Sequence, residues 1–278
     1  MDRPHEAPLY LDGDWISPQT PRVWILAFAY VLLVKICAHH LPTIKHGLLP
    51  SWYYMMGIFQ LVLLVAFLPE MTSLFTESWS GTVCQRGSLY TSSWTGTVVR
   101  LFVISKTVDL FETLLIILEG RNPLDIHVFH HAVTLLYVWH SYTQQSAMAR
   151  WFVFSNLVSH VMLYTYLSPK KFGLRPCWLL VAISQLGSLV ICLLATFTAQ
   201  RVLQSGGSCD VENWRLSLDK LIIAVFIIIF SDFYHNKLRE LRDRQEMSGD
   251  QLRSSRRLVQ PRGKSRGIRT GVKAVGHA

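Results

Sequence analysis

Residues 177–199 read "CWLLVAISQLGSLVICLLATFTA", a run without a single charged side chain. A helix needs about 20 mainly apolar residues to cross the hydrocarbon core of a bilayer, so this stretch is predicted to be a transmembrane helix. Six other apolar blocks come close to the same length, and the chain is therefore predicted to be an all-α integral membrane protein with seven spans. The block at 126–142 is marginal and is also compatible with a partly re-entrant segment. The six blocks cover about 23–38, 52–69, 98–118, 126–142, 149–167 and 217–236.

The composition of the whole chain agrees with this class. Half of the 278 residues are hydrophobic and 16% are charged, whereas about a quarter of the residues in a soluble domain are charged. The first residues, "MDRPHEAPLYLDGDW", are polar and do not have the pattern of a cleavable signal peptide. The first span is therefore expected to be retained as an anchor.

The basic residues predict the orientation. Most of the formal net charge of +9 comes from the end of the chain, and Lys and Arg concentrate on the cytosolic side of membrane proteins. The end is therefore expected to be cytosolic, and seven spans then place the N-terminus on the far side. We expect a polar segment at 1–22 on that side, a seven-helix membrane domain at 23–240 and a disordered basic tail at 241–278. No nucleic-acid-binding module is recognisable in the tail, so its alternatives to a topological role are anionic lipid or substrate phosphates.

Two of the five cysteines lie in loops on the predicted far side of the membrane. Cys84 and Cys209 are compatible with a disulfide if that side is an oxidising compartment, although spacing alone does not establish the pairing. Cys37, Cys177 and Cys192 lie in or next to the apolar blocks and are expected to be buried apolar residues.

Charged residues interrupt the third apolar block, "SKTVDLFETLLIIL" at 105–118. Lys106, Asp109 and Glu112 are three residues apart, which places them on one face of a helix, where Lys106 can pair with Asp109 or with a neighbouring helix. Ionisable residues at membrane depth are costly and usually functional. The structural alternative is an interior salt bridge that holds two helices together.

Three histidines stand in the next block, "HVFHH" at 127–131. His127, His130 and His131 are three and four residues apart, so they share one face of a helix. A single histidine in such a position is often only hydrogen-bonded to a neighbour, but three on one face indicate a functional role. The block is therefore the main candidate for chemistry.

A second polar stripe follows in "FSNLVSHVMLYTYL" at 154–167. Asn156, His160 and Tyr164 are four residues apart and lie on one helical face, which can meet His131 of the preceding helix. Gln185 adds an amide in the sixth block, where helix–helix hydrogen bonding is the simpler explanation. Together these residues predict a buried imidazole cluster beside the lysine and the two carboxylates.

The cluster is compatible with more than one kind of site, because an imidazole can ligate a metal, act as a general base or act as a nucleophile. Membrane di-iron oxygenases use several histidine boxes, whereas this chain has one box, and His127, His130, His131 and His160 would hold one metal ion at most. A nucleophilic imidazole with a second imidazole as its base needs fewer parts and suits acyl transfer. The non-enzymatic alternative is a seven-helix transporter or receptor whose polar stripe lines a ligand path.

The order and spacing of these blocks resemble the ELO family, the very-long-chain fatty acid elongases. The resemblance rests on "SKTVDLFETLLIIL", "HVFHH", "NLVSHVMLY" and "FSDFYHNK", and it covers roughly residues 95–240. It implies seven transmembrane helices, six of them forming a barrel around a narrow acyl tunnel. It also implies that an acyl-CoA condenses with malonyl-CoA in the endoplasmic reticulum membrane, giving a 3-ketoacyl-CoA two carbons longer, CO2 and CoA.

The resemblance also implies roles for the histidines. His130, the middle histidine of the box, would attack the thioester and carry the acyl group. His127 and His131 would orient it and relay protons, and His160 would assist deprotonation or decarboxylation. Burial among apolar helices would keep water away from the acyl-imidazole.

Other polar residues are expected to position the substrates. Asn156 and Tyr164 would hold His160 or the developing enolate. No cofactor is expected to be bound permanently. Acyl-CoA and malonyl-CoA are the expected ligands, the bilayer and other enzymes of the elongation cycle are the expected partners, and a homo-oligomer is compatible with the sequence. The phosphates of CoA would be contacted at the cytosolic mouth by four basic residues, which fit the charge rule for topology equally well: Lys170, Lys171, Arg175 and Lys237.

Two motifs depart from the family pattern. The family reads Lys-x-x-Glu-x-x-Asp-Thr where residues 106–113 read Lys-x-x-Asp-x-x-Glu-Thr, so the reach of each acid changes by one methylene. The family reads Thr-x-x-Gln-x-x-Gln where residues 182–188 read Ala-x-x-Gln-x-x-Ser. The charge of the first face is kept, and we expect these departures to bear on substrate range.

Overall fold

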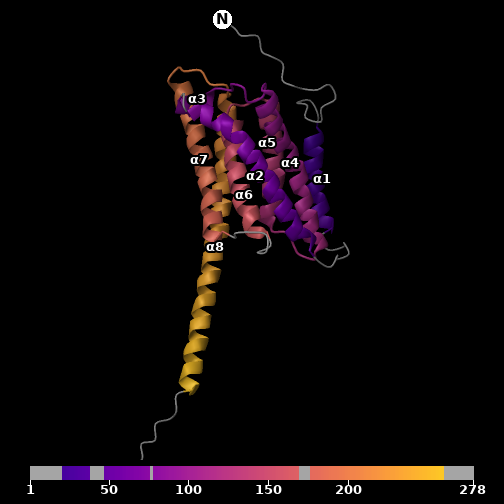
Figure 1. The fold of residues 1–278 in the computed structure, drawn as a ribbon, viewed down its shortest axis with the longest axis vertical. Helices are drawn as coiled ribbons and strands as arrows, with labels where there is room; N and C mark the ends of the chain where they lie inside the picture. Colours follow the sequence, from indigo (N-terminus) through magenta and orange to yellow (C-terminus); the bar gives the residue numbers. More distant parts are fainter. Residues whose placement is uncertain (1–20, 38–46, 76–77, 169–175, 260–278) are drawn as a thin grey trace, which may run out of the picture. The chain divides into compact units, whose positions relative to one another are not determined.

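The computed structural model describes residues 21–37, 47–75, 78–168 and 176–259. These residues form eight helices and contain no strand (Figure 1), so the fold is all-α, as predicted. The helices are α1 (Arg22–Cys37), α2 (Leu48–Phe75), α3 (Trp79–Cys84), α4 (Ser93–Leu118), α5 (Asp125–Thr143), α6 (Ala149–Leu167), α7 (Trp178–Gln204) and α8 (Asn213–Val259).

Seven of these helices coincide with the apolar blocks of the sequence. α5 is one continuous helix over the marginal block at 126–142. The short helix α3 lies in a loop that the hydropathy pattern does not mark. α8 continues past the block at 217–236, and within it the chain divides into two compact units, residues 1–232 and 233–278.

Glycines end two of the long helices. The chain leaves α4 at Gly120 and α7 at Gly206, where φ is +73° and +81°. Glycine adopts this left-handed conformation without a Cβ clash. In each turn the next amide donates to a carbonyl five residues earlier, which satisfies a group that the helix end would leave unpaired. The distances are 3.1 Å from Arg121 to Ile116 and 2.9 Å from Gly207 to Val202.

The long helices of the first unit pack side by side (Figure 1). α2 packs against α4 and α6, α4 against α5, and α6 against α7, while α1 lies against α4 and α5. Side chains join the start of α8 to two neighbours. Arg215 of α8 donates to Ser141 of α5, and Lys220 of α8 donates to Gln200 of α7 at 2.8 Å. The helices α4, α5 and α6, which carry most of the predicted site, are therefore neighbours.

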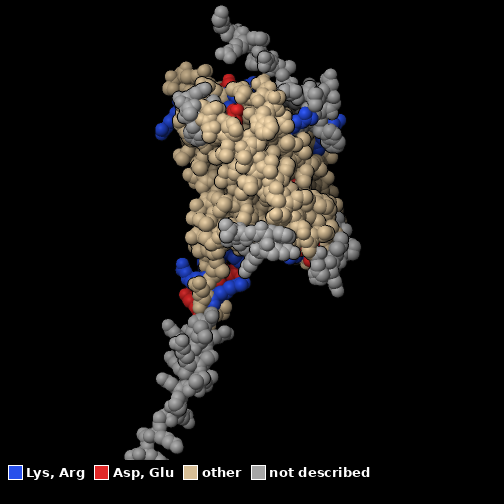
Figure 2. Space-filling view, viewed as in Figure 1, with Lys and Arg blue, Asp and Glu red and all other residues tan. Residues whose placement is uncertain are grey.

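The outer surface of the bundle is apolar. Figure 2 shows a broad band with few Lys, Arg, Asp or Glu residues, bounded by charged residues near both ends of the helices. Large apolar side chains such as Trp24, Val62 and Phe197 are 65%, 59% and 47% exposed. A water-soluble monomer rarely exposes a continuous apolar patch of more than a few hundred Å², so this surface suits lipid.

Two of the described helices are long and apolar enough to cross a membrane. They are Leu48–Ser73 within α2 and Trp178–Gln204. α4 is also long, but its sequence includes Arg100, Lys106 and two acids. Of these four, Lys106 and the two acids are residues that the sequence predicted to be functional.

A buried ion pair fixes one end of the bundle. Arg150 of α6 is fully buried and donates two hydrogen bonds to Glu70 of α2, at 3.0 and 3.1 Å. It also donates to the carbonyls of Thr82, Gln85 and Arg86, at 2.8, 2.8 and 2.9 Å. Arg150 therefore holds the end of α3 and the following loop against α2 and α6.

Cys84 and Cys209 form a disulfide at this end of the bundle, a pairing that the sequence had left open. The bond joins the end of α3 to the loop between α7 and α8, where the Asp210 amide also donates to the Cys84 carbonyl at 2.8 Å. Cys192 is buried, as predicted, but Cys177 is exposed. The prediction for Cys177 is wrong because this residue precedes the first turn of α7 and lies outside the packed bundle.

The disulfide predicts a thiol count and a loss of stability. A denatured chain should expose three reactive thiols before reduction and all five after it, measured as the mass added by a maleimide. Replacing both cysteines by serine should lower the free energy of unfolding by about 2–5 kcal/mol, because the bond closes a long loop. Five reactive thiols without reductant would contradict the pairing.

Candidate active site

Three ionisable residues of α4 are buried inside the bundle. Lys106, Asp109 and Glu112 are 3%, 2% and 4% exposed. The Lys106 ammonium donates to Asp109 Oδ2 at 2.9 Å and to Asn156 Oδ1 of α6 at 3.0 Å. The sequence predicted that Lys106 pairs either within its own helix or with a neighbouring helix. In the structure Lys106 does both.

The two acids of α4 have different partners. Asp109 pairs with Lys106 one turn away on the same helix, whereas Glu112 Oε2 accepts a hydrogen bond from the Tyr164 hydroxyl of α6 at 2.9 Å. Tyr164 is 1% exposed. The shorter side chain serves the contact within α4, and the longer one crosses to α6. The order of the two acids, Asp109 before Glu112, therefore fits the two contacts that they make.

The histidine box occupies the first two turns of α5. The ring centroids of His127 and His131 are 4.1 Å apart, and those of His130 and His131 are 5.7 Å apart. His160 of α6 stacks on His130, with 6.3 Å between the centroids and 29° between the planes. The sequence favoured His131 for this contact. Neighbouring residues on a helix point about 100° apart, so the rotation of α5 decides which of the two histidines faces the ring of His160.

Aromatic side chains of α8 cover His130. The ring centroids of Phe226 and Phe230 lie 5.2 and 5.6 Å from that of His130. His130 is half-buried. Its surroundings are thus an imidazole on one helix and apolar rings on another, which limits the access of water.

A small polar cavity lies among these side chains. About 10 Å³ of it is open to the centre of a water molecule, which is room for roughly one water. Two buried atoms at the cavity, Asp109 Oδ1 and His160 Nδ1, have no hydrogen-bond partner in the part of the chain that the structure describes. Buried polar atoms are normally paired, so these two can accept a ligand or a water. The cavity is lined by Lys106, Asp109, His130, His131, Thr134 and His160.

A hydrogen-bonded chain holds His127. Its Nε2 atom lies 2.9 Å from Thr113 Oγ1 of α4, and this hydroxyl lies 2.8 Å from the Tyr30 hydroxyl of α1. Thr113 is fully buried and Tyr30 is 6% exposed. The box is therefore tied to α4 directly and to α1 through Thr113.

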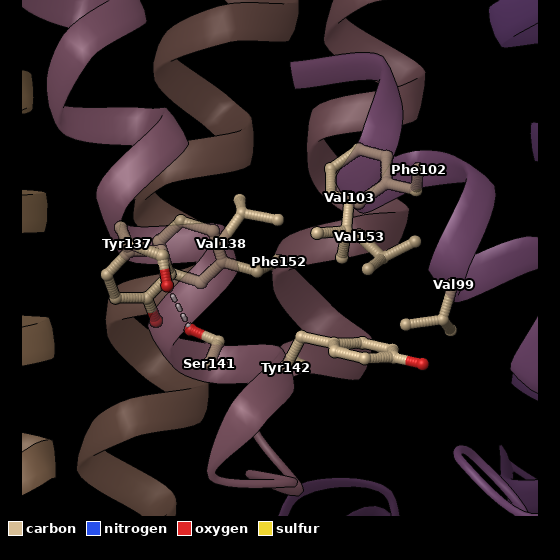
Figure 3. Close-up of a pocket in the computed structure, with 10 residues that line it drawn as sticks. Val99, Phe102, Val103, Tyr137, Val138, Ser141, Tyr142, Phe152 and Val153 are labelled. Carbon is tan, nitrogen blue, oxygen red and sulfur yellow. Dashed lines mark hydrogen bonds between the residues drawn. The ribbon is translucent and has the colours of Figure 1, made fainter. Parts of the chain in front are cut away.

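An apolar cavity lies farther along the same three helices (Figure 3). On α4 it begins one turn before Lys106, and on α5 one turn after Thr134. Figure 3 shows aliphatic and aromatic side chains around it, and Ser141 donating to the Tyr137 carbonyl at 2.7 Å. The polar cavity and the apolar cavity thus lie one after the other along α4 and α5. The lining includes Val99, Phe102, Val103, Tyr142, Phe152 and Val153.

Three candidate metal ligands also come together. Ligand atoms of Glu112, His127 and His131 lie within 4.8 Å of one another, whereas the sequence suggested four imidazoles as the ligand set. Two histidines and one carboxylate form a set that binds iron or zinc in other proteins. Glu112 and His127 also hydrogen-bond to Tyr164 and Thr113.

The other predicted site residues are one amide on α7 and four basic residues. Gln185 is half-buried on α7 and does not line the cavity. One turn later Ser188 donates to the Ser155 carbonyl of α6 at 3.0 Å, which is a helix–helix contact. Lys237 belongs to the second unit, where its hydrogen bond to Glu240 lowers the pKa of that carboxyl. Three basic residues lie outside the described part of the chain: Lys170, Lys171 and Arg175.

The sequence analysis missed several buried polar residues. Gln60 of α2 is fully buried, and neither of its amide atoms has a hydrogen-bond partner among the described residues. Arg215 and Asp219 form a buried ion pair at 3.1 Å near the start of α8. The sequence signal for Gln60 was a lone amide in the block at 52–69. The signal for Arg215 and Asp219 was a pair of opposite charges four residues apart at the edge of the last block.

Comparison with known proteins identifies the family. The model of the GNS1/SUR4 (ELO) family matches residues 15–246. The very long chain fatty acid elongase 6 of Drosophila melanogaster is 28% identical over 49% of this chain and 44% of its own length. The long chain fatty acid elongase 2 of Caenorhabditis elegans is 23% identical over 80% of this chain and 84% of its own. The fatty acid elongase 2 of Trypanosoma brucei brucei is 24% identical over 74% and 80%.

No solved structure matches the chain significantly. The family model nevertheless covers most of the sequence, including every described residue of the histidine box and of the α4 row. The chain therefore belongs to the GNS1/SUR4 (ELO) family, a membrane-embedded family whose relatives reported above are fatty acid elongases.

Proposed function

We propose that this chain is a condensing enzyme that joins a long-chain acyl-CoA to malonyl-CoA, as a very-long-chain 3-oxoacyl-CoA synthase. The products are a 3-ketoacyl-CoA two carbons longer, CO2 and CoA. The observation that carries the proposal is the polar cavity, where His130 stacks on His160 beside the Lys106–Asp109 pair. Acyl-CoA and malonyl-CoA are the ligands, and no permanently bound cofactor is part of the proposal.

The first step is acyl transfer to His130. One ring nitrogen attacks the thioester carbonyl, the carbon–sulfur bond breaks, and an acyl-imidazole forms. The proton of the other ring nitrogen passes to the CoA thiolate through a neighbouring base, for which we propose His131, at 5.7 Å between ring centroids. A nucleophile with an adjacent base is the usual arrangement for covalent acyl transfer.

The second step is decarboxylation and attack. Malonyl-CoA loses CO2, its C2 carbon attacks the acyl carbon, and the bond to the imidazole breaks. The imidazolate then takes up one proton, so that the net reaction consumes one proton. The enolate is stabilised by fixed donors. Lys106 has three N–H groups, of which two go to Asp109 and Asn156, and the third remains for the enolate oxygen.

The acyl chain is proposed to extend into the apolar cavity of Figure 3. Each of the two cavities has about 10 Å³ open to a water centre, so a thioester would have to displace side chains such as Phe102. The carbonyl would remain at the imidazoles while the methylenes pack against Val103 and Val153. This arrangement of polar and apolar space fits an acyl thioester better than it fits a uniformly polar ligand.

The proposed membrane arrangement is a ring of six helices with α1 outside it. The ring order α2, α4, α5, α8, α7, α6 agrees with the packing of neighbours and with the contacts of Arg215 and Lys220. We place the disulfide end in the lumen of the endoplasmic reticulum, because disulfides persist in oxidising compartments. The histidine box then lies toward the cytosol, with the N-terminus luminal and the C-terminus cytosolic.

CoA phosphates would meet basic residues at the cytosolic mouth, for which Lys170, Lys171, Arg175 and Lys237 are proposed. Other enzymes of the elongation cycle must act on the 3-ketoacyl product, since condensation leaves a ketone that has to be reduced. They are proposed as partners within the same bilayer. Self-association into a homo-oligomer is compatible with the broad apolar surface of Figure 2.

An elongation assay tests the proposed function. Membranes that contain the full chain receive radiolabelled malonyl-CoA and acyl-CoAs of different length and unsaturation. Label in a 3-ketoacyl product two carbons longer is the expected result, and the panel identifies the accepted substrates. Absence of label with every acyl-CoA, from protein shown to be folded, would contradict the proposal and favour a transporter or receptor.

The second candidate function is metal-dependent lipid oxidation. It is favoured by the proximity of Glu112, His127 and His131. Metal analysis of purified active protein separates the two functions. Stoichiometric iron, with loss of activity on chelation and its return with iron, would support oxidation, whereas condensation by metal-free protein would exclude it.

Tyr164→Phe should lower kcat for condensation roughly tenfold to a hundredfold. The substitution keeps the ring but removes the hydroxyl that donates to Glu112, and a buried carboxyl without its donor disturbs the row beside Lys106. Tyr53→Phe is the matched control, because the ring of Tyr53 stacks on that of Tyr164 at 6.0 Å. Equal activity of the two variants would show that the hydrogen bond to Glu112 is dispensable.

A further inference from the structure

We infer that Tyr30 of α1 is a positioning residue for the histidine box, and that it fixes which ring nitrogen of His127 carries the proton. The inference rests on the proposed function and adds a residue that lies outside the sequence motifs of the site. α1 packs against α4 and α5, but none of its residues lines the polar cavity. Any effect of Tyr30 on the reaction must therefore pass through another side chain.

That side chain is Thr113. The Tyr30 hydroxyl lies 2.8 Å from Thr113 Oγ1, and the same oxygen lies 2.9 Å from His127 Nε2. Thr113 is fully buried and Tyr30 nearly so, so bulk water does not compete for these atoms. Within the described residues neither hydroxyl has another hydrogen-bond partner. The helices α1, α4 and α5 thus each contribute one side chain to a linear series of hydrogen bonds.

The number of hydrogens sets the direction of this chain. If Tyr30 donates to Thr113 and Thr113 donates to His127 Nε2, both hydroxyl hydrogens have acceptors. If His127 Nε2 carries a hydrogen and donates to Thr113, one hydroxyl hydrogen is left without an acceptor in a buried place. An unpaired buried donor is costly. The first direction is therefore favoured.

The favoured direction leaves His127 neutral, with its hydrogen on Nδ1. A second proton on Nε2 would displace the hydrogen that Thr113 donates there. His127 therefore meets the ring of His131, 4.1 Å away, as a neutral imidazole of one tautomer. In nucleophile–base sets, holding the base in the wrong tautomer lowers kcat by orders of magnitude. Removing the Tyr30 hydroxyl weakens the preference for one direction without removing any group from the cavity.

The test compares four variants in the elongation assay. Tyr30→Phe keeps the ring and is expected to lower kcat roughly tenfold, with KM for both CoA thioesters changed less than about twofold. Thr113→Val should lower kcat at least as much, and Thr113→Ser should restore most of it. Residues that act in series are non-additive, so Tyr30→Phe should cause no further loss in the Thr113→Val background.

A packing control separates positioning from stability. Val34 lies one turn after Tyr30 on α1 and is buried in the apolar cluster with Val128 and Leu135. Val34→Ala is expected to lower thermal stability at least as much as Tyr30→Phe, with kcat unchanged. A similar loss of kcat in Val34→Ala would mean that α1 acts through packing, and the inference would fail.

Ring nitrogen-15 spectra of histidine-labelled protein give a readout that does not depend on activity. The His127 signal is assigned by its loss in His127→Gln. An unprotonated Nε2 in the wild type and a mixture of tautomers in Tyr30→Phe are expected. The inference is overturned by an unchanged spectrum, by unchanged kcat in Tyr30→Phe, or by an equal loss in the Thr113→Val background. A wild type that does not condense would instead refute the proposed function, while the spectra still test the hydrogen-bonded chain.

Discussion

His130→Ala is expected to abolish condensation, with a loss of at least about a thousandfold in kcat. The imidazole is the proposed carrier of the acyl group, and alanine offers no atom to which the acyl group can be transferred. No neighbouring histidine takes its place in this account, because His130 is the ring that faces both His160 and the aromatic side chains of α8. The loss should be the same for every acyl-CoA in the panel.

The control for this substitution is on the same helix. His140 lies near the other end of α5, where its ring is 5.7 Å from that of Trp214, and it does not line the polar cavity. His140→Ala should keep kcat within about threefold of the wild type. Both variants are measured at equal amounts of folded protein, verified by size-exclusion chromatography in detergent. Condensation by His130→Ala within tenfold of the wild type would remove His130 from the covalent role.

Arg150→Met is expected to cause the largest loss of stability of any single substitution proposed here, about 3–5 kcal/mol. It would leave Glu70 as an unpaired buried carboxylate, and it would remove the donor from three backbone carbonyls in and just after α3. Thermal unfolding in detergent measures the effect. Arg201→Met is the matched control, because Arg201 is an exposed arginine on α7, and its midpoint should move by less than about 2 °C.

A double substitution distinguishes a lost ion pair from lost packing. Glu70→Gln together with Arg150→Met removes both charges, and it should be more stable than Arg150→Met alone, because no unpaired charge remains buried. A double variant less stable than the single one would show that the hydrogen bonds of Arg150 to the α3 loop dominate. Elongation activity is expected to fall only with the folded fraction, since Arg150 does not line the polar cavity.

The spacing of polar residues predicted which side chains share a helix face in the candidate site, because helices have a fixed period. Lys106 and Asp109 pair as their spacing indicates, and the rings of His127 and His131 are in contact one turn apart. Each apolar block also lies largely within one helix, although α8 extends well beyond its block. These features depend on one helix at a time, so one sequence is sufficient to predict them.

Features that depend on two helices were less predictable. The stacking of His160 on His130 depends on how α5 and α6 rotate about their axes, and hydropathy does not specify that rotation. Gln60 shares its block with apolar neighbours only, and one buried amide without a pattern around it predicts no partner. The link from Tyr30 to His127 crosses three helices. This link depends on how α1 packs against α4 and α5, and the spacing of residues within one helix does not predict that packing.

The acyl-imidazole is the central claim, and it is tested most directly by mass analysis of the protein after incubation with a long-chain acyl-CoA in the absence of malonyl-CoA. Rapid acid quenching and digestion should give a peptide containing residues 127–131 that carries the mass of the acyl group, with fragmentation assigning it to the His130 imidazole. The adduct should disappear when malonyl-CoA is added before quenching, and His130→Ala should not form it. An acyl group found on another side chain, or wild-type protein that condenses while no adduct is detected at any time, would contradict the account.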